Sequence, residues 1–217
     1  MFERLFGLGR RSTLVEAAFR DVSTMLQQSA RMLDHSLAAL LENQELEVDL
    51  DDMDDVVDEG ERMVRRTILE HLSVDPRHDL VASLILVSMV QDAERIGDFA
   101  HGLAELVPLA GSPRQGPFAE ELRALSGRLR PLFEVCERAF REDDLEEARR
   151  VIVEHSELKR EFIEFTRRVA SSELGADMAI VYAGAARIMR RISAHLSNIA
   201  STVVQPYDRI RHGDEEV

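Results

Sequence analysis

Residues 80–98, LVASLILVSMVQDAERIGD, predict a helix that is buried over most of its circumference and carries acidic side chains near its end. The apolar-rich run at residues 80–90 is about half as long as a segment that spans a bilayer. Glu94 and Asp98 follow this run at i, i+4 spacing, so both lie on one helix face. A mostly buried helix that keeps two carboxylates four residues apart indicates a specific role for them.

Apolar residues recur at i, i+3 and i+4 spacing along the whole chain and predict six long helices. Glycine (11) and proline (6) are scarce and tryptophan is absent, so turn-dense all-β folds lack the turn residues that they need. The helices are expected at residues 12–43, 48–72, 78–107, 118–142, 144–172 and 176–205. The sequence therefore predicts an all-α fold.

The segment 108–117, PLAGSPRQGP, holds three of the six prolines and two glycines and reads as a linker. Three helices are expected on each side of it, with short loops that favour antiparallel neighbours. Aligning residues 92–98, DAERIGD, with 188–194, IMRRISA, matches an arginine and an isoleucine. We therefore predict a six-helix antiparallel bundle made of two tandem three-helix repeats, residues 1–110 and 111–217.

The chain of 217 residues has a net charge of −14, so nonspecific binding to nucleic acid is not expected, and cations or cationic partners are favoured. Residues 1–110 hold 10 basic and 22 acidic residues, a net charge of −12, against 17 and 19, a net charge of −2, in residues 111–217. The single cysteine, Cys136, lies in an apolar stretch and is expected to be buried. Without a disulfide, a signal-peptide core or a membrane-spanning segment, the sequence favours a cytoplasmic protein.

Residues 42–61 contain eleven acidic residues and no lysine or arginine. The outermost of them, at 42–52, are interpreted as a solvated acidic surface. Asp54, Asp58 and Glu61 differ, because i, i+4, i+7 spacing places all three carboxylates on one helix face. That helix thus carries a second row of acids, in addition to the pair at the end of the helix described first.

Two interpretations of these acids stay open from spacing alone. Helical bundles bind divalent cations and iron through oxygen-rich clusters on facing helices. Alternatively, Glu94 and Asp98 form structural ion pairs with Arg95 or another arginine. His101, three residues after Asp98, is either a further ligand or an ordinary packed or solvated side chain.

Motifs that would indicate an enzyme are absent from the sequence. It contains no glycine-rich phosphate loop, G-x-S-x-G elbow or H-E-x-x-H motif. Glu-x-x-His pairs, which di-iron bundles use, are also missing. No nucleophile can be nominated, and we predict that the chain is not an enzyme.

The D-x-x-V-D-x-x-E helix at residues 54–61, followed by A-E-R-I-G-D at 93–98, resembles the PhoU family of phosphate-signalling proteins. The two-fold three-helix layout extends this resemblance over the whole chain. In that family the acids of each repeat line a metal site on the bundle surface. The resemblance implies a divalent metal or iron in the first repeat, held by Asp54, Asp58, Glu61, Glu94 and Asp98.

The second repeat departs from the family pattern where acids are expected. His155, Lys159, Arg190 and Ala194 stand at those positions, and two cations and a methyl group cannot coordinate a hard cation. We therefore predict one metal site per chain. The basic residues either pair with acids such as Glu157 and Glu161 or, with Arg187 and Arg191, form a patch that binds an anion.

The resemblance implies a non-enzymatic regulator of phosphate uptake and phosphate-dependent signalling, acting as a cytoplasmic homodimer. The implied partners are a membrane phosphate transporter and, as a further candidate, a sensor kinase. Two alternatives stay open, namely an accessory regulator of a different ion transporter and a metal-dependent enzyme or metal store that uses the same carboxylates. The N-terminal segment, with Phe2, Leu5, Phe6 and Leu8 beside arginines, either associates peripherally with a membrane or partner or is a frayed terminus.

Overall fold

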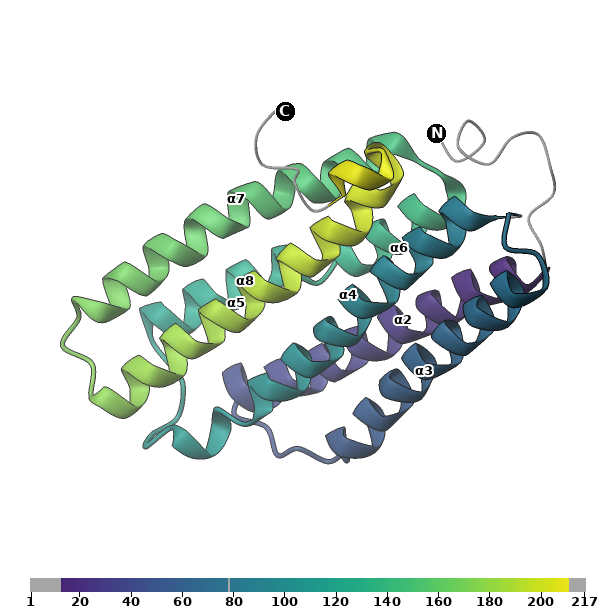
Figure 1. Cartoon of the computed structure of the whole chain (residues 1–217). Helices are drawn as coiled ribbons and strands as arrows, with labels where there is room; N and C mark the ends of the chain where they lie inside the picture. The colour runs from purple at the N-terminus through teal and green to yellow at the C-terminus, as the bar shows by residue number, and fades with distance from the viewer. Residues whose placement is uncertain (1–12, 78, 211–217) are drawn as a thin grey trace.

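The computed structural model describes residues 13–77 and 79–210, and all regular elements in these ranges are helices (Figure 1). The all-α prediction is therefore confirmed. The elements are α2 (Thr13–Leu41), α3 (Leu50–Val74), α4 (Leu80–Ala104), η1 (Val107–Leu109), α5 (Pro117–Leu129), α6 (Leu132–Glu142), α7 (Leu145–Ala170), α8 (Ala176–Val204) and η2 (Tyr207–Arg209). The N-terminal segment considered above lies outside the described residues.

The corresponding helices α3 and α7 begin in the same way. Asp49 precedes α3, and its carboxylate accepts hydrogen bonds from the backbone N–H groups of the second and third residues after it. Asp144 does the same before α7. An N-cap aspartate satisfies N–H groups that have no partner inside the helix, and its charge interacts favourably with the helix dipole. These local signals explain why both helices start close to the predicted residues.

The apolar faces of the seven α-helices in the described part of the chain meet in one continuous core. Helices α4 and α8 pack against each other at the centre; α2 and α3 pack on α4, and α6 and α7 pack on α8 (Figure 1). The half formed by α2, α3 and α4 is thereby matched by α5–α6, α7 and α8. The structure confirms the predicted bundle of two tandem three-helix repeats.

The fourth predicted helix, at residues 118–142, is not continuous. It is divided into α5 and α6, with Arg130 and Pro131 between them. Proline has no N–H group to donate to the carbonyl four residues earlier, and its ring crowds the preceding turn. The prediction of one continuous helix was therefore wrong, because Pro131 interrupts the backbone hydrogen bonding between α5 and α6.

The linker at 108–117 is held firmly against the first repeat. Arg114 is only 8% exposed, and its guanidinium donates to the backbone carbonyls of Leu40 (2.6 Å) and Ala39 (2.7 Å) at the end of α2. Asn43 accepts from the Arg114 N–H group and donates to its carbonyl oxygen. Polar groups of the linker therefore provide the partners that the last carbonyls of α2 cannot find within their own helix.

Two further expectations concern the cysteine and membrane-spanning segments. Cys136 is fully buried, as predicted, and burial raises the pKa of its thiol far above the usual range. None of the described helices combines the length and apolar character that crossing a membrane would need.

Candidate functional site on the surface of α3 and α4

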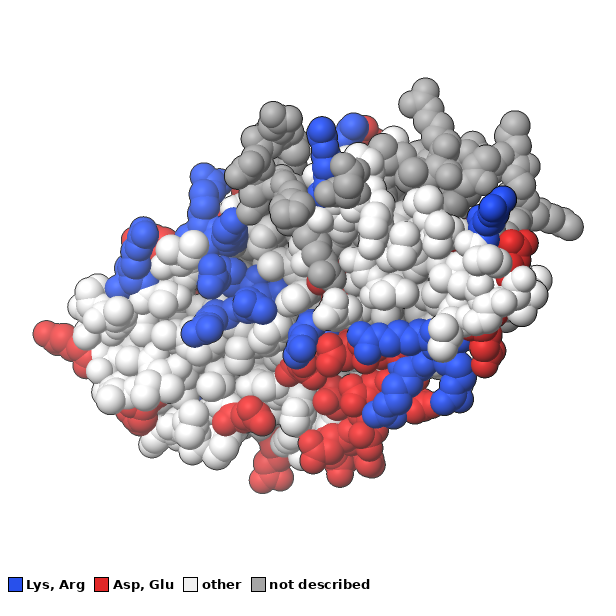
Figure 2. Space-filling model, viewed as in Figure 1, with Lys and Arg blue, Asp and Glu red and all other residues white. Residues whose placement is uncertain are grey.

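Helices α3 and α4 bring all five predicted ligands to one surface of the first repeat. Acidic side chains gather there over both helices (Figure 2). Asp54, Asp58 and Glu61 come from α3, and Glu94 and Asp98 come from α4; each is partly buried. The i, i+4 spacing predicted the acidic face within each helix, and the packing of α3 on α4 joins the two faces into one surface.

The packing of α3 on α4 depends on a glycine at this surface. A Cβ atom at Gly97 would lie 3.1 Å from Cγ1 of Val57 and 3.4 Å from both Oδ1 of Asp54 and Oγ of Ser29. The absence of a side chain lets α2, α3 and α4 approach one another here. It also brings the Asp54 carboxylate close to the acids of α4.

The carboxylates on this face repel one another. Burial, followed by the charge of Asp98, raises the pKa of Glu94 to about 7, and Arg95 offsets part of this effect. Burial and the charge of Asp98 also raise the pKa of Asp54, with His101 acting in the opposite direction. A nearby positive charge would therefore be favourable at this face.

Arginines on the same two helices meet part of that need. Arg95 Nη1 lies 2.9 Å from Asp98 Oδ2, and Arg95 Nε lies 3.6 Å from Glu94 Oε2. On α3, Arg62 contacts Asp58 at 3.4 Å, and Arg65 contacts Glu61 at 2.7 Å. These pairs are three to four residues apart, or adjacent for Glu94, and lie at the solvated rim, where an ion pair contributes at most about 1 kcal/mol.

The ion pairs predicted as the alternative to a metal site are thus present, within single helices. His101, the additional candidate ligand, instead lies 3.1 Å from Asp51, with its Nε2 toward Oδ1. Within residues 13–77 and 79–210, no group of three or more His, Cys, Asp or Glu side chains is arranged to hold a metal ion. The donors themselves are all carboxylates, the ligand type that Mg²⁺, Mn²⁺ and Ca²⁺ prefer.

The charge of Glu94 predicts a pH dependence of stability in chelator-treated protein. Because its pKa rises from 4.5 to about 7 on folding, the protonated form stabilises the fold, and this contribution is lost as pH rises from 4.5 through 7. We expect Glu94→Gln to raise the free energy of unfolding by about 1 kcal/mol at pH 8 and to have little effect at pH 5. Urea denaturation at both pH values measures this difference.

The exposed Glu70 on α3 offers a matched control. Glu70→Gln removes the same charge away from the cluster, and we expect it to change stability equally at both pH values. An equal effect of Glu94→Gln at pH 5 and pH 8 would show that Glu94 is ionised throughout and that the repulsion is unimportant.

The corresponding surface of the second repeat differs in its chemistry. His155 occupies the position of Asp54, and its Nδ1 lies 2.9 Å from Oγ of Ser193, which occupies the position of Gly97. A buried histidine in contact with a serine hydroxyl thus stands where the first repeat has a carboxylate. Glu157 and Glu161, the acids expected near the basic residues of this surface, both form ion pairs with Arg128 of α5.

Sequence reasoning missed a polar cluster between the two central helices. Asp92 on α4 is 2% exposed, and its Oδ1 accepts hydrogen bonds from Asn198 (3.0 Å) and from His195 Nδ1 (2.8 Å) on α8. The ring of His195 stacks on the ring of Phe99. Arg191 also lies over the Phe99 ring, with its guanidinium carbon 5.1 Å from the ring centroid. The only local signal was an acid within an apolar run.

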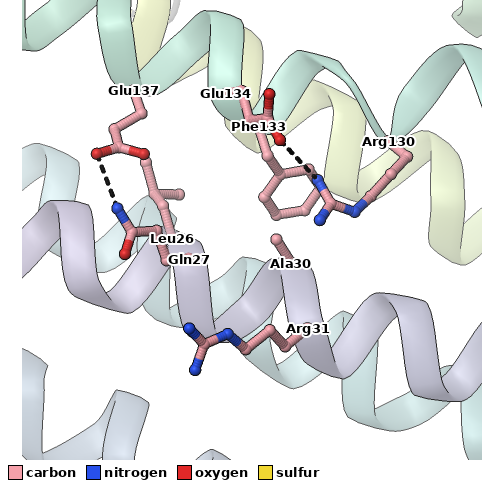
Figure 3. A pocket seen from close by; sticks show the side chains of 8 residues that line it. All are labelled: Leu26, Gln27, Ala30, Arg31, Arg130, Phe133, Glu134 and Glu137. Atoms are coloured by element: carbon pink, nitrogen blue, oxygen red, sulfur yellow. Dashed lines mark hydrogen bonds and ion pairs between the residues drawn. The ribbon is translucent and has the colours of Figure 1, made fainter.

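A groove of about 270 Å³ lies between α2 and α6 (Figure 3). Gln27 donates to Glu137 across it at 3.0 Å, and Arg130 lies 4.0 Å from Glu134 and 2.7 Å from Asp34. Figure 3 shows Gln27 and Arg130 pointing toward these glutamates. Because these polar groups bond one another, the groove is a weaker candidate site than the surface of α3 and α4.

Fold and surface together define a class of protein, a two-repeat helical bundle with a carboxylate cluster on one repeat. The model of the PhoU domain matches residues 22–107 and 124–203, one match in each repeat. The chain belongs to the PhoU family.

Known proteins match over most of the chain. A Thermotoga maritima protein named phosphate-specific transport system accessory protein PhoU homolog 1 is 25% identical over 193 residues, covering 85% of this chain and 83% of the relative. The crystal structure of PhoU from Pseudomonas aeruginosa is similar with a TM-score of 0.80 and 22% identity, covering 88% of this chain and 95% of that one. A phosphate transport system regulatory protein PhoU from Streptococcus pneumoniae has a TM-score of 0.76 at 14% identity, covering 94% and 97%. These two structures support the fold.

Proposed function

We propose that the chain is a non-enzymatic regulator of phosphate transport that acts in the cytoplasm on a membrane phosphate transporter. The observation that carries this proposal is the PhoU match in both repeats, together with the relative named as an accessory protein of phosphate-specific transport. A sensor kinase is a second partner in the proposal, and a homodimer is the proposed form.

The proposal includes a cation at the face of α3 and α4, held by Asp54, Asp58, Glu61, Glu94 and Asp98. The raised pKa of Glu94 supports it: burial and then the charge of Asp98 disfavour the ionised carboxyl, and a bound cation would favour it. The carboxylates would have to turn toward the ion and away from arginines such as Arg95. A divalent ion or iron would supply positive charge on a face that is otherwise strongly acidic.

The cation would affect docking through this charge. Residues 1–110 carry a net charge of −12, which repels anionic membrane surfaces and acidic partners. Neutralising part of the face would lower that repulsion, and the rigid packing of α3 on α4 around Gly97 would hold the ion at a defined place. Metal and transporter binding are therefore expected to be linked.

One experiment tests both parts of the proposal. Untagged protein purified from cells is analysed for metal content and then for binding to membranes that contain the phosphate transporter, with and without EDTA. We expect metal at a fixed ratio in the wild type and its loss in Glu94→Ala/Asp98→Ala. We also expect EDTA or the double substitution to weaken transporter binding about tenfold.

A Glu70→Ala/Glu105→Ala variant removes two exposed acids outside the cluster and should behave as the wild type. Transporter binding without any metal would show that the acids are a charged docking surface. If no variant bound the transporter under any condition, the link to phosphate transport would be wrong.

A further inference from the structure

The surface of α7 and α8 carries the opposite charge to the surface of α3 and α4. Aligning the buried residues Val57, Val64 and Ile68 of α3 with Leu158, Phe165 and Val169 of α7 puts the helices in register. Basic residues then fall at positions that are acidic in the first repeat. Lys159 stands for Asp58, Arg160 for Glu59 and Arg190 for Glu94.

Basic side chains gather over α7 and α8 on the same side of the molecule that shows the acidic cluster over α3 and α4 (Figure 2). Arg187, Arg190 and Arg191 follow i, i+3, i+4 spacing and thus share a face of α8. We call the surface that these three arginines form with Lys159 and Arg160 of α7 the basic face. The acidic face is the surface of α3 and α4 that contains the five acids described above with Asp55 and Glu59.

Three arginines of the basic face carry positive charge that no ion pair among the described residues neutralises. Among the described residues, Arg160, Arg187 and Arg190 form no ion pair with an acid. The arginines of the acidic face, by contrast, are paired on their own helices. The nearby glutamates of α7 are occupied by Arg128. Arg160, Arg187 and Arg190 are therefore available to acidic groups from outside the chain.

Apolar side chains accompany these charges. Leu84 and Val87 precede Glu94 on the same face of α4 and are 37% and 40% exposed, and Ile180 precedes Arg187 on α8 and is 59% exposed. Arginine beside exposed aliphatic groups is typical of protein–protein interfaces. A binding site for a small anion would not need these exposed apolar side chains.

We propose that two copies of the chain pair face to face, with the acidic face of each against the basic face of the other. This proposal deepens the homodimer of the proposed function by naming its surface. A two-fold axis lying in the interface along the contact of α4 and α8 exchanges the two halves of this surface. Both charge contacts then form twice in one closed dimer.

A second copy fits this surface better than a membrane does. The acidic face lies beside the basic face and would be repelled by an anionic bilayer, as would the chain as a whole with its net charge of −14. A second copy would be attracted by both faces, because its basic face lies against the acidic face of the first copy and its acidic face lies against the basic face.

Charge reversal tests the pairing by sedimentation velocity of the full chain in EDTA-containing buffer. The wild type is expected to be dimeric at about 50 mM salt and to dissociate toward about 500 mM, because salt screens exposed charges. Arg160→Glu/Arg187→Glu and Asp55→Arg/Glu59→Arg should each weaken the dimer at least about tenfold. Their equimolar mixture should restore it, since both contacts are complementary again.

Arg20→Glu/Arg31→Glu changes the net charge by the same amount on exposed positions of α2 and should leave the dimer intact. A monomeric wild type at low salt would overturn the proposal. So would a dimer that survives both reversals, although a homodimer would then persist through another surface. If the mixture failed to reassociate, the basic face would be assigned to a different partner. The same would follow if a monomeric chain bound lipid vesicles and Arg160→Glu/Arg187→Glu abolished that binding.

Discussion

Replacing Asp92 by alanine is expected to lower the free energy of unfolding by about 3 kcal/mol. The carboxylate is almost fully buried between α4 and α8 and accepts hydrogen bonds from His195 and Asn198. Its removal leaves two polar groups without their partner in the contact between the two repeats. Losing one member of a buried polar pair costs more than the pair itself contributes, because the remaining group is desolvated and uncompensated.

Urea denaturation of Asp92→Ala and of Gln91→Ala, an exposed neighbour on α4, measures this effect. The control should change stability by no more than about 0.5 kcal/mol. His195→Ala should cost less in the Asp92→Ala background than in the wild type, because the two residues interact directly. A loss below 1 kcal/mol for Asp92→Ala, or simple additivity of the two substitutions, would contradict this account of the repeat interface.

Arg114→Ala is expected to lower the free energy of unfolding of the otherwise wild-type chain by about 3 kcal/mol. The buried guanidinium donates to two carbonyls at the C-terminal end of α2, and charged donors form the stronger hydrogen bonds. Arg123 is already engaged at the same helix end, where it donates to the carbonyl of Leu41 and to Glu42. Removing the Arg114 side chain therefore removes two hydrogen bonds that hold the linker against the end of α2.

Arg114→Lys separates charge from geometry, because lysine keeps the positive charge and loses the planar fork. We expect it to recover less than half of the lost stability. Arg77→Ala, at an exposed turn, serves as the control and should be near neutral in the same denaturation experiment. An Arg114→Ala protein as stable as that control would show that water satisfies the α2 carbonyls equally well.

The helices were predictable because their signals are local. Apolar spacing, capping aspartates and scarce glycine and proline act within a few residues, so the predicted and observed helix ends mostly agree within two or three residues. The break at Pro131 is equally local, because it follows from the missing N–H group and the ring of that proline. The acids of α3 and α4 were also predictable in position, since i, i+4 spacing defines a helix face.

The charge interactions and the burial of those acids could be determined only from the folded structure. Spacing within α4 indicates that Arg95 and Glu94 can reach Asp98, yet only the packing of α3 on α4 buries Asp54 and lets the charge of Asp98 raise its pKa. Charge interactions across helices depend on distance and burial, which local sequence does not contain.

The amino-acid sequence by itself determined the helices, their duplication and the unequal net charges of the two repeats, −12 and −2. Tertiary structure alone decided that Asp92 meets His195, that Arg114 closes the end of α2 and that both charged faces lie on one side of the molecule. These pairs join residues 74 to 103 positions apart. The packing of the whole core determines such partners. Burial of the apolar faces of all helices sets how the helices lie against one another, and this arrangement decides which polar groups come into contact.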